Sequence, residues 1–361
     1  MMFQRIHIEL TNRCNFSCVF CPSSLMSRPP RDLEFNLVIK ILDEIVQEKL
    51  TDTVFFHVMG EATLYGKLED VIREASRRKL KTVLTTNGYG LSLELLDRIM
   101  NAGIDHILFS AQTPDADSFK LRKAPGSFFS YRKHICSLIA KIIERGTTKT
   151  TLSFLTTPIP FFTLPSKRYH ILRNKRTLVA AFIDWFEEIT AFMPDSAFKN
   201  KLYGKKKLLI KRLAAFRMMG WNKLKITWQL TFETRVLGDW IHQGLTAGKI
   251  AKASIGYCEG LQTHFGILSN GNMVFCCTDF DGKTTFGNIK ETSLVEALMQ
   301  KKAQDAIRGF KKLLVKDPYC QRCLGDASFD KSMARQVGSI LYFKLYRPWW
   351  DRKREREDIL V

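Results

Sequence analysis

Three cysteines lie within eight residues near the start of the chain, in the run Cys14-Asn15-Phe16-Ser17-Cys18-Val19-Phe20-Cys21. They follow an alternating apolar segment, residues 3–10, that predicts a first β-strand. Free cysteines rarely cluster so tightly, so a metal cluster is favoured over unrelated buried thiols or a disulfide. A [4Fe–4S] cluster needs four ligands. Three local cysteines would therefore leave one iron open to a chelating small molecule.

Four further cysteines lie in the last third of the chain. Cys258 precedes a predicted hairpin, Cys276 lies at its far end, and Cys320 and Cys323 form a C-x2-C pair. Four thiolates can complete an S4 zinc site or hold all the irons of a second cubane. The spacing leaves both alternatives open.

The chain has nine cysteines, which include Cys277 beside Cys276 and Cys136 in a predicted helix. Cys277 could substitute for its neighbour as a ligand, and Cys136 is expected to be a core thiol. No secretory signal and no apolar run of about 20 residues is visible. These features predict a cytoplasmic protein with reduced thiols.

Strand-like and helix-like segments alternate through the first half of the chain. Strands are predicted at 3–10, 53–59, 81–86, 104–111 and 150–155, and helices at 36–49, 67–79, 92–101 and 128–145. Such units predict an α/β parallel sheet or barrel whose active residues lie at the carboxyl ends of the strands. The three-cysteine loop follows the first of these ends.

The C-x3-C-x2-C spacing, with Phe20 before the last cysteine, resembles the radical S-adenosylmethionine (SAM) superfamily. This resemblance implies a partial (β/α)6 TIM-like barrel with a [4Fe–4S] cluster on Cys14, Cys18 and Cys21. In that family the amino and carboxylate groups of SAM chelate the open iron. An electron from the cluster then cleaves SAM to a 5′-deoxyadenosyl radical.

Segments that end the next strands resemble the SAM pocket of that family. Gly60-Glu61-Ala62-Thr63 resembles its GGEP-like motif, whose glutamate accepts a hydrogen bond from the SAM amino group, although Ala62 replaces the usual proline and Met59 the first glycine. Thr85-Thr86-Asn87-Gly88 resembles its TNG segment. The resemblance implies cofactor-binding roles for Phe20, Gly60, Glu61, Thr86, Asn87, Ser110 and Arg122. Without it, Gly60-Glu61 is a simple turn and Arg122 a surface arginine.

A second resemblance concerns the later cysteines. Gly271, five residues before Cys276, and the run Phe286-Gly287-Asn288-Ile289 ahead of the C-x2-C pair look like the SPASM/twitch domains of radical SAM enzymes. One C-x2-C pair without a downstream cysteine is similar to the shorter twitch form, with one auxiliary [4Fe–4S] cluster. The resemblance implies four protein ligands, Cys258, Cys276, Cys320 and Cys323, and a role in electron transfer.

These patterns predict three parts. Residues 1–255 would form the barrel, with a basic insertion at about 156–222, residues 256–330 the auxiliary cluster domain, and residues 331–361 a basic amphipathic extension. Inside them we expect a strand at 223–231, a hairpin around Asn270-Gly271, and helices at 177–192, 205–219 and 292–304. The insertion is expected either to recognise substrate or to pack against the barrel.

The net charge of +20 is concentrated, because residues 199–225 hold ten Lys or Arg and no Asp or Glu. Such surfaces favour anionic partners, although a solvated basic surface without a ligand is the alternative. Nucleic acid is disfavoured as a partner, since no nucleic-acid-binding module is recognisable. Trp349 and Trp350, flanked by arginines, predict peripheral contact of the tail with a membrane.

The resemblance implies a radical SAM oxidoreductase or modifying enzyme, reduced by a donor such as flavodoxin or ferredoxin. The short stretch before Cys14 leaves no room for a leader-binding domain of ~80–100 residues. We therefore expect a two-electron oxidation or modification of a small, sugar-like or phosphorylated substrate. A SPASM-type peptide maturase and an RNA-modifying or nucleic-acid-binding protein are the alternatives. No catalytic base can be named from the sequence.

Overall fold

The computed structural model describes residues 2–157, 169–237, 250–349 and 360. Its centre is a ten-stranded sheet in the order β10-β9-β8-β1-β2-β3-β4-β5-β7-β6. Neighbouring strands from β8 to β7 run parallel. These parallel strands are β8 (His264–Ile267), β1 (Arg5–Ile8), β2 (Thr53–Phe56), β3 (Lys81–Thr86), β4 (His106–Gln112), β5 (Lys149–Thr156) and β7 (Leu230–Val236). The partial α/β barrel predicted from the sequence is therefore confirmed.

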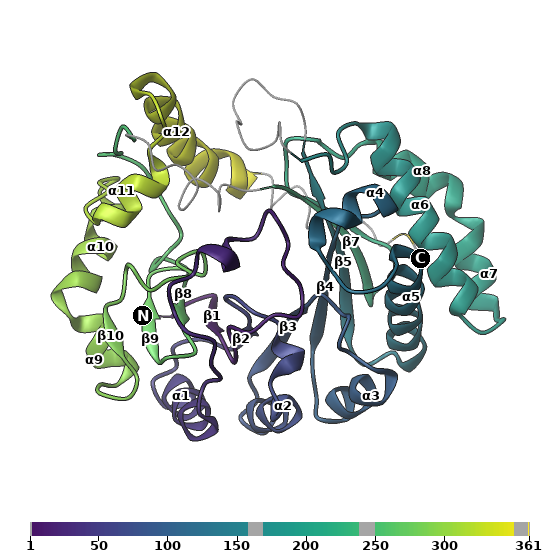
Figure 1. Cartoon of the computed structure of the whole chain (residues 1–361), viewed down its shortest axis with the longest axis horizontal. Helices are drawn as coiled ribbons and strands as arrows, with labels where there is room; N and C mark the ends of the chain where they lie inside the picture. Colours follow the sequence, from purple (N-terminus) through teal and green to yellow (C-terminus); the bar gives the residue numbers. More distant parts are fainter. Residues whose placement is uncertain (1, 158–168, 238–249, 350–359, 361) are drawn as a thin grey trace.

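Helices cover the outer face of this sheet (Figure 1). In chain order they are α1 (Phe35–Gln47), α2 (Leu68–Arg77), α3 (Leu93–Asn101), the short α4 (Ala116–Phe119), α5 (Phe128–Arg145) and α6 (Lys175–Phe192). Several of these helices have a side-chain N-cap. Ser92, Ser127 and Asn174 each accept a hydrogen bond from a backbone amide in the first turn of the helix. Among the described residues, the predicted helices of the first half match these elements closely.

Helix α6 lies in the predicted insertion and packs on the sheet like the other helices of the barrel. Of the two roles expected for the insertion, this part therefore has the packing role. The ring of Phe182 lies 4.7 Å from that of Phe154 in β5 and 4.8 Å from that of Phe232 in β7. Buried apolar side chains of the strands thus face the helices. Because strand side chains alternate, their neighbours face the inside of the barrel.

The basic region after α6 folds as α7 (Ala197–Gly204) and α8 (Lys206–Ala214). The single strand predicted at 223–231 is wrong. The segment forms two antiparallel strands, β6 (Asn222–Lys225) and β7, joined by a tight turn. The hydroxyl of Thr227 accepts hydrogen bonds from the amides of Gln229 and Leu230, which closes this turn.

The C-terminal part extends the same sheet, because β8 pairs with β1. The predicted hairpin joins β8 to β9 (Asn272–Val274), and β10 (Gly287–Asn288) pairs with β9. Its turn requires Gly271, whose φ is +90° and whose added Cβ would lie 2.7 Å from the side chain of Asn288. The single helix predicted at 292–304 is instead α9 (Leu294–Met299) and α10 (Lys301–Lys311), because Gln300 is extended.

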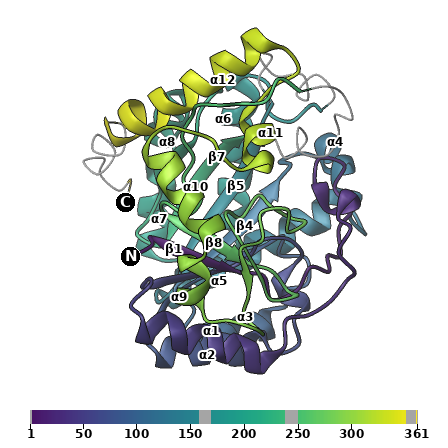
Figure 2. The same ribbon diagram turned by 90° about the vertical axis from the view of Figure 1, so that its left-hand side faces the viewer.

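The chain continues through α11 (Pro318–Leu324) and α12 (Phe329–Leu341), followed by a π-helical turn at Tyr342–Tyr346. Figure 2 shows α12 across one end of the molecule. No helix in the described part of the chain is long and apolar enough to cross a membrane. Trp350 and most of the predicted charged tail lie outside the described residues, as do residues 158–168 of the predicted insertion.

Candidate cluster and cofactor sites

The three-cysteine loop lies at the carboxyl end of β1. Cys14 is exposed, Cys18 and Cys21 are partly buried, and all three thiols are free of disulfides. The Cys21 amide donates a hydrogen bond to the Cys18 carbonyl at 3.0 Å. The loop is also tied to the rest of the chain, because the Val19 amide donates to the Leu121 carbonyl. Burial raises the pKa of the partly buried Cys18 thiol. Metal binding must therefore displace protons from these sulfurs.

Gly60 and Glu61 lie directly against this loop. The Glu61 amide donates to the Arg13 carbonyl at 2.7 Å. Gly60 has a φ of +75°, and a Cβ added there would lie 2.3 Å from the Thr11 carbonyl oxygen. Only glycine tolerates both that conformation and that contact. The end of β2 and the entry to the cysteine loop are thus pressed together.

The Glu61 carboxylate is buried and organised by the end of β3. Its Oε1 accepts hydrogen bonds from both Thr63 and the Thr86 hydroxyl, and its Oε2 accepts one from the Asn87 amide at 2.7 Å. Burial raises the pKa of Glu61, and these hydrogen bonds oppose that shift. Oε2 therefore keeps a lone pair that an ammonium group can use. Asn87 also donates to Asn15 at 2.7 Å, which ties β3 to the cysteine loop.

Ser110, Arg122 and Phe20 surround the same region. The Ser110 hydroxyl donates to the Thr86 carbonyl. Arg122 is buried, donates to the carbonyls of Ser110 and Ala111, and lies over the Phe16 ring at 4.7 Å. Phe20 is buried in the core. The structure therefore brings the SAM-pocket residues proposed from the sequence to one end of the barrel, with the Arg122 guanidinium engaged by backbone carbonyls.

The four later cysteines come together from three segments. Cys258 precedes β8, Cys276 follows β9, and Cys320 and Cys323 lie on α11, whose start is capped by the Asp317 side chain. The thiol of Cys258 interacts electrostatically with those of Cys276 and Cys323, and the thiol of Cys320 with all three others. Burial raises the pKa of Cys258, Cys276 and Cys320.

Zinc and an iron–sulfur cubane place different demands on four thiolates. A tetrahedral zinc site, with Zn–S bonds of about 2.3 Å, holds its sulfurs about 3.8 Å apart. An iron–sulfur cubane holds its thiolates on separate irons and so spaces them more widely. Cys277 points away from this group, with its sulfur 4.0 Å from His264 Nε2.

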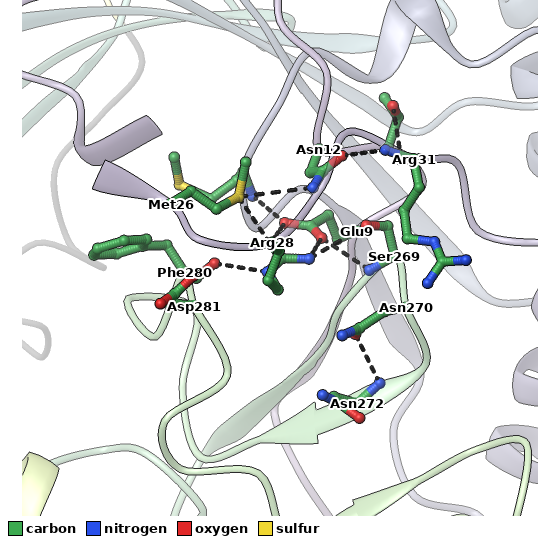
Figure 3. Close-up of polar contacts among 12 residues, drawn as sticks. Glu9, Asn12, Met26, Arg28, Arg31, Ser269, Asn270, Asn272, Phe280 and Asp281 are labelled. Atoms are coloured by element: carbon green, nitrogen blue, oxygen red, sulfur yellow. Dashed lines mark hydrogen bonds and ion pairs between the residues drawn. The ribbon is translucent and has the colours of Figure 1, made fainter. Parts of the chain in front are cut away.

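Sequence reasoning missed a buried ion pair that anchors the cysteine loop (Figure 3). Glu9, which has no solvent exposure, accepts hydrogen bonds from Arg28 at 2.7 and 2.9 Å. It also accepts from the amides of Met59 after β2 and Ser269 after β8. The available signal was an acidic residue at one of the polar positions of an alternating segment, shortly before the cysteine loop.

The same anchor reaches the C-terminal hairpin region. Arg28 Nε donates to the Phe280 carbonyl at 2.9 Å, as Figure 3 shows, and the neighbouring Ser27 donates to the Asp281 carboxylate. Phe280 and Asp281 follow Cys276 by a few residues. The loop of the first cysteine group is thus fastened to the segment that carries a member of the second.

Comparison with known proteins identifies the two regions. The model of the Radical SAM superfamily matches residues 8–161, and that of the SPASM iron–sulfur cluster-binding domain matches residues 258–324. A tungsten-containing aldehyde ferredoxin oxidoreductase cofactor-modifying protein from Pyrococcus furiosus is 30% identical over 105 residues, which are 29% of this chain and 30% of that protein. The PqqA peptide cyclase of Methylorubrum populi is 24% identical over 201 residues, 52% of this chain and 49% of that protein. The chain thus spans less than half of either relative.

Among solved structures, SuiB from Streptococcus suis with S-adenosylmethionine superposes with a TM-score of 0.55 at 17% identity, over 86% of this chain and 68% of that one. This likeness shows the shared fold. The matched regions contain both cysteine groups and the Gly60-Glu61 and Thr86-Asn87 segments. Residues 8–161 therefore match a radical SAM domain, and residues 258–324 match a SPASM-type iron–sulfur cluster-binding domain.

Proposed function

We propose that this enzyme modifies a peptide by radical chemistry. The observation that carries the proposal is its similarity to PqqA peptide cyclases, which spans 201 residues in one of them. SuiB, which shares the fold, has been solved with its precursor peptide SuiA. These relatives favour the peptide alternative over the small, sugar-like substrate expected from the short stretch before Cys14.

We assign the cofactors to the residues as follows. Cys14, Cys18 and Cys21 hold the first cluster, and Glu61 Oε2 accepts a hydrogen bond from the SAM amino group. When bound and reduced, the cluster supplies the electron that cleaves SAM and so produces a carbon radical able to take a hydrogen atom from the substrate. A donor such as flavodoxin or ferredoxin provides that electron. The remaining pocket residues are Phe20, Gly60, Thr86, Asn87, Ser110 and Arg122.

Cys258, Cys276, Cys320 and Cys323 hold the auxiliary cluster, with the domain limits expected from the sequence at 1–255, 256–330 and 331–361. With four protein ligands that cluster has no open iron. When bound, this cluster would be able to accept the electron that a substrate radical loses when it is oxidised. The Glu9–Arg28 anchor keeps the two cysteine groups in a fixed relation.

Two measurements test this assignment. After anaerobic reconstitution, about eight irons are expected in the wild type and about four in the Cys14/Cys18/Cys21→Ala variant. Incubation with SAM, dithionite and a synthetic peptide pool should yield 5′-deoxyadenosine and a mass change in at least one peptide. Both products should be lost in the triple variant. Oxidation of a sugar alcohol with no peptide changed would overturn the peptide proposal.

We also propose that the C-terminal helix touches an anionic membrane surface. Val337, Leu341, Leu345 and Trp349 recur at every fourth position and are 43–65% exposed. Basic side chains of the same segment, such as Lys344, can contact lipid headgroups. Wild-type protein should therefore sediment with phosphatidylserine vesicles, and Leu341→Ser/Leu345→Ser should not. Equal sedimentation of the two proteins would discard the contact.

A further inference from the structure

Arg122 is a buried arginine beside the first cysteine group, and only 1% of its surface is exposed. It ends a short 3-10 turn, Lys120–Arg122, that follows β4 and α4. This turn is fastened to the cysteine loop, because the Leu121 carbonyl accepts a hydrogen bond from the Val19 amide at 2.9 Å. A cation buried to this extent costs free energy unless hydrogen-bond acceptors surround it. The acceptors around Arg122 therefore indicate its role.

Backbone carbonyls hold one end of the guanidinium. Its Nη1 donates to the Ser110 carbonyl at 2.9 Å and also to the Ala111 carbonyl. Two aromatic rings pack against it, since its central carbon lies 4.7 Å from the centre of the Phe16 ring and 5.7 Å from that of Tyr131. The side chain is thus fixed by the end of β4 and by these two rings.

The Tyr131 hydroxyl is a further neighbour of the guanidinium. It donates to the Asn87 carbonyl at 2.7 Å, so its oxygen can still accept a hydrogen bond. Burial raises the pKa of Tyr131, whereas the charge of Arg122 and a hydrogen bond from its side chain oppose this rise. Two carbonyls and this hydroxyl therefore occupy donors that binding of the SAM carboxylate would require.

The remaining neighbour is the sulfur of Cys18, in the middle of the cysteine loop. Burial raises the pKa of this thiol, and the charge of Arg122 and a side-chain hydrogen bond from it oppose the rise. The Nε of Arg122 is buried and, in the part of the chain that the structure describes, has no oxygen or nitrogen acceptor. A thiolate accepts hydrogen bonds more strongly than a thiol because it carries a full charge. The contact should therefore strengthen when Cys18 loses its proton to bind iron.

Arg13 provides a matched comparison, because it directly precedes Cys14 in the sequence. Its guanidinium pairs with Asp32 at the surface, where the two side chains are 47% and 39% exposed. The carboxylate and the solvent screen the charge of Arg13. Of these two arginines, Arg122 is the one that is buried against a cysteine sulfur.

We propose that Arg122 tunes the first cluster by donating a charge-assisted hydrogen bond from its Nε to the Cys18 thiolate, rather than binding the SAM carboxylate. This inference rests on the assignment of Cys14, Cys18 and Cys21 to that cluster. Hydrogen bonds to the ligating sulfurs help to set the reduction potential of an iron–sulfur cluster. Uptake of one electron adds a negative charge, which a buried cation beside a ligand stabilises. Arg122 acts through Cys18 and is therefore a positioning residue.

Redox titration with EPR detection tests this contact on the reconstituted full-length enzyme in the absence of SAM. The signal of the first cluster is obtained by subtracting that of the Cys14/Cys18/Cys21→Ala variant. Arg122→Gln removes the charge, so reduction should become about tenfold less favourable, a fall of about 59 mV in the midpoint potential for one electron. Arg122→Lys keeps the charge and should restore most of the difference. Arg13→Gln should change the equilibrium constant by less than about twofold.

The affinity for SAM separates this role from binding of the SAM carboxylate. Equilibrium dialysis of radiolabelled SAM against the oxidised holoenzyme measures it. Arg122→Gln should keep the affinity within about threefold, because the guanidinium does not contact the ligand. A loss of more than about tenfold, with an unchanged midpoint potential, would assign Arg122 to the SAM carboxylate and overturn the inference.

A spectroscopic measurement on the wild type makes the test independent of how well the variants fold. Protein whose arginine guanidinium groups carry nitrogen-15 is reduced without SAM. After the same subtraction, pulsed EPR of the first cluster should show a weak nitrogen-15 coupling. Arg13→Gln should keep this coupling and Arg122→Lys should lose it. No coupling in the wild type would mean that the guanidinium does not donate to a ligand of the cluster, and would overturn the inference.

Iron content and the circular dichroism spectrum verify that each variant is folded and loaded. Equal midpoint potentials of the wild type and Arg122→Gln overturn the tuning role and leave the cysteine assignment standing. A wild type that takes up no iron overturns both. A fall in Arg13→Gln as large as that in Arg122→Gln would show that any nearby positive charge is sufficient, and would overturn the specific contact with Cys18.

Discussion

At the residue scale, the contact between Gly60 and the cysteine loop leaves no space for a side chain. Gly60→Ala places a Cβ 2.3 Å from the Thr11 carbonyl at a φ of +75°. We expect a loss of roughly 2–4 kcal/mol in the free energy of unfolding and less iron at the first site, because the loop must move away. Urea unfolding and iron analysis measure both effects.

Gly66→Ala is the matched control for that change. Nothing lies within 4 Å of a Cβ added at Gly66, and it is not in the left-handed region. Its effect on stability should stay within about 1 kcal/mol. If Gly60→Ala were equally mild, the close contact between the end of β2 and the cysteine loop would not matter for cluster binding.

A second prediction at the residue scale concerns Glu233 and the pH dependence of the stability of the fold. Burial alone would raise its pKa, but Arg235, Lys223 and hydrogen bonds prevail and lower the pKa from 4.5 to about 2. A carboxyl with a depressed folded-state pKa stabilises the fold fully above its unfolded pKa, and this contribution disappears as the pH falls towards 2. The contribution is on the order of 3 kcal/mol.

Glu233→Gln should therefore flatten the decrease of the urea midpoint between pH 4.5 and pH 2. Glu48→Gln, at an exposed glutamate, should keep the wild-type pH profile. An identical profile for wild type and Glu233→Gln would show that the ion pairs around Glu233 contribute nothing to stability.

At the scale of elements, the Glu9–Arg28 pair connects the end of β1, the cysteine loop and the turn after β8. The side chains are 0% and 6% exposed. Removal of one partner leaves the other charge buried, so Glu9→Gln and Arg28→Gln should each lower the stability by about 3–5 kcal/mol. The double variant should lose less than the sum of the two single losses.

An exposed ion pair is the control for this double-mutant comparison. Lys290 and Glu34 are 42% and 63% exposed, and Lys290→Ala should give no measurable change. Chemical denaturation of the wild type, the two single variants and the double variant gives the coupling free energy between Glu9 and Arg28 directly. Additive losses at Glu9 and Arg28 would mean that the pair does not act as one anchor.

At the scale of the whole molecule, α12 supports the segment that leads to Cys258. The Gln336 side chain accepts hydrogen bonds from the amides of Ser254 and Ile255, and the Ser339 hydroxyl accepts one from the Tyr257 amide. Gln336→Ala leaves two amides without these acceptors. We expect a loss of about 1–3 kcal/mol and less iron at the second site, with the first site unchanged.

Iron content and EPR of the Gln336→Ala holoenzyme separate the two sites. Val337→Ala, at an exposed neighbour on the same helix, should keep both clusters. Loss of iron from the first site alone would contradict the support that we assign to α12.

Local patterns in the sequence determined much of this protein. The three-cysteine spacing, the alternation of strands and helices, and the Asn270-Gly271 turn depend on residues close in the chain, because ligand spacing, periodicity and turn geometry are local properties. These patterns predicted the barrel, the hairpin and the family. They were less useful around residues 223–231, where a turn closed by the Thr227 side chain separates two strands. They also failed around residues 292–304, where the extended Gln300 separates two helices.

Only the tertiary structure decided which distant residues meet. Glu9 and Arg28 are joined to Ser269 and Phe280, more than 240 residues away, because β8 pairs with β1. Arg5 of β1 and His264 of β8 likewise lie side by side only because these two strands pair. Charge in such a site depends on burial and on partners brought together by the fold, and no local spacing in the chain encodes either.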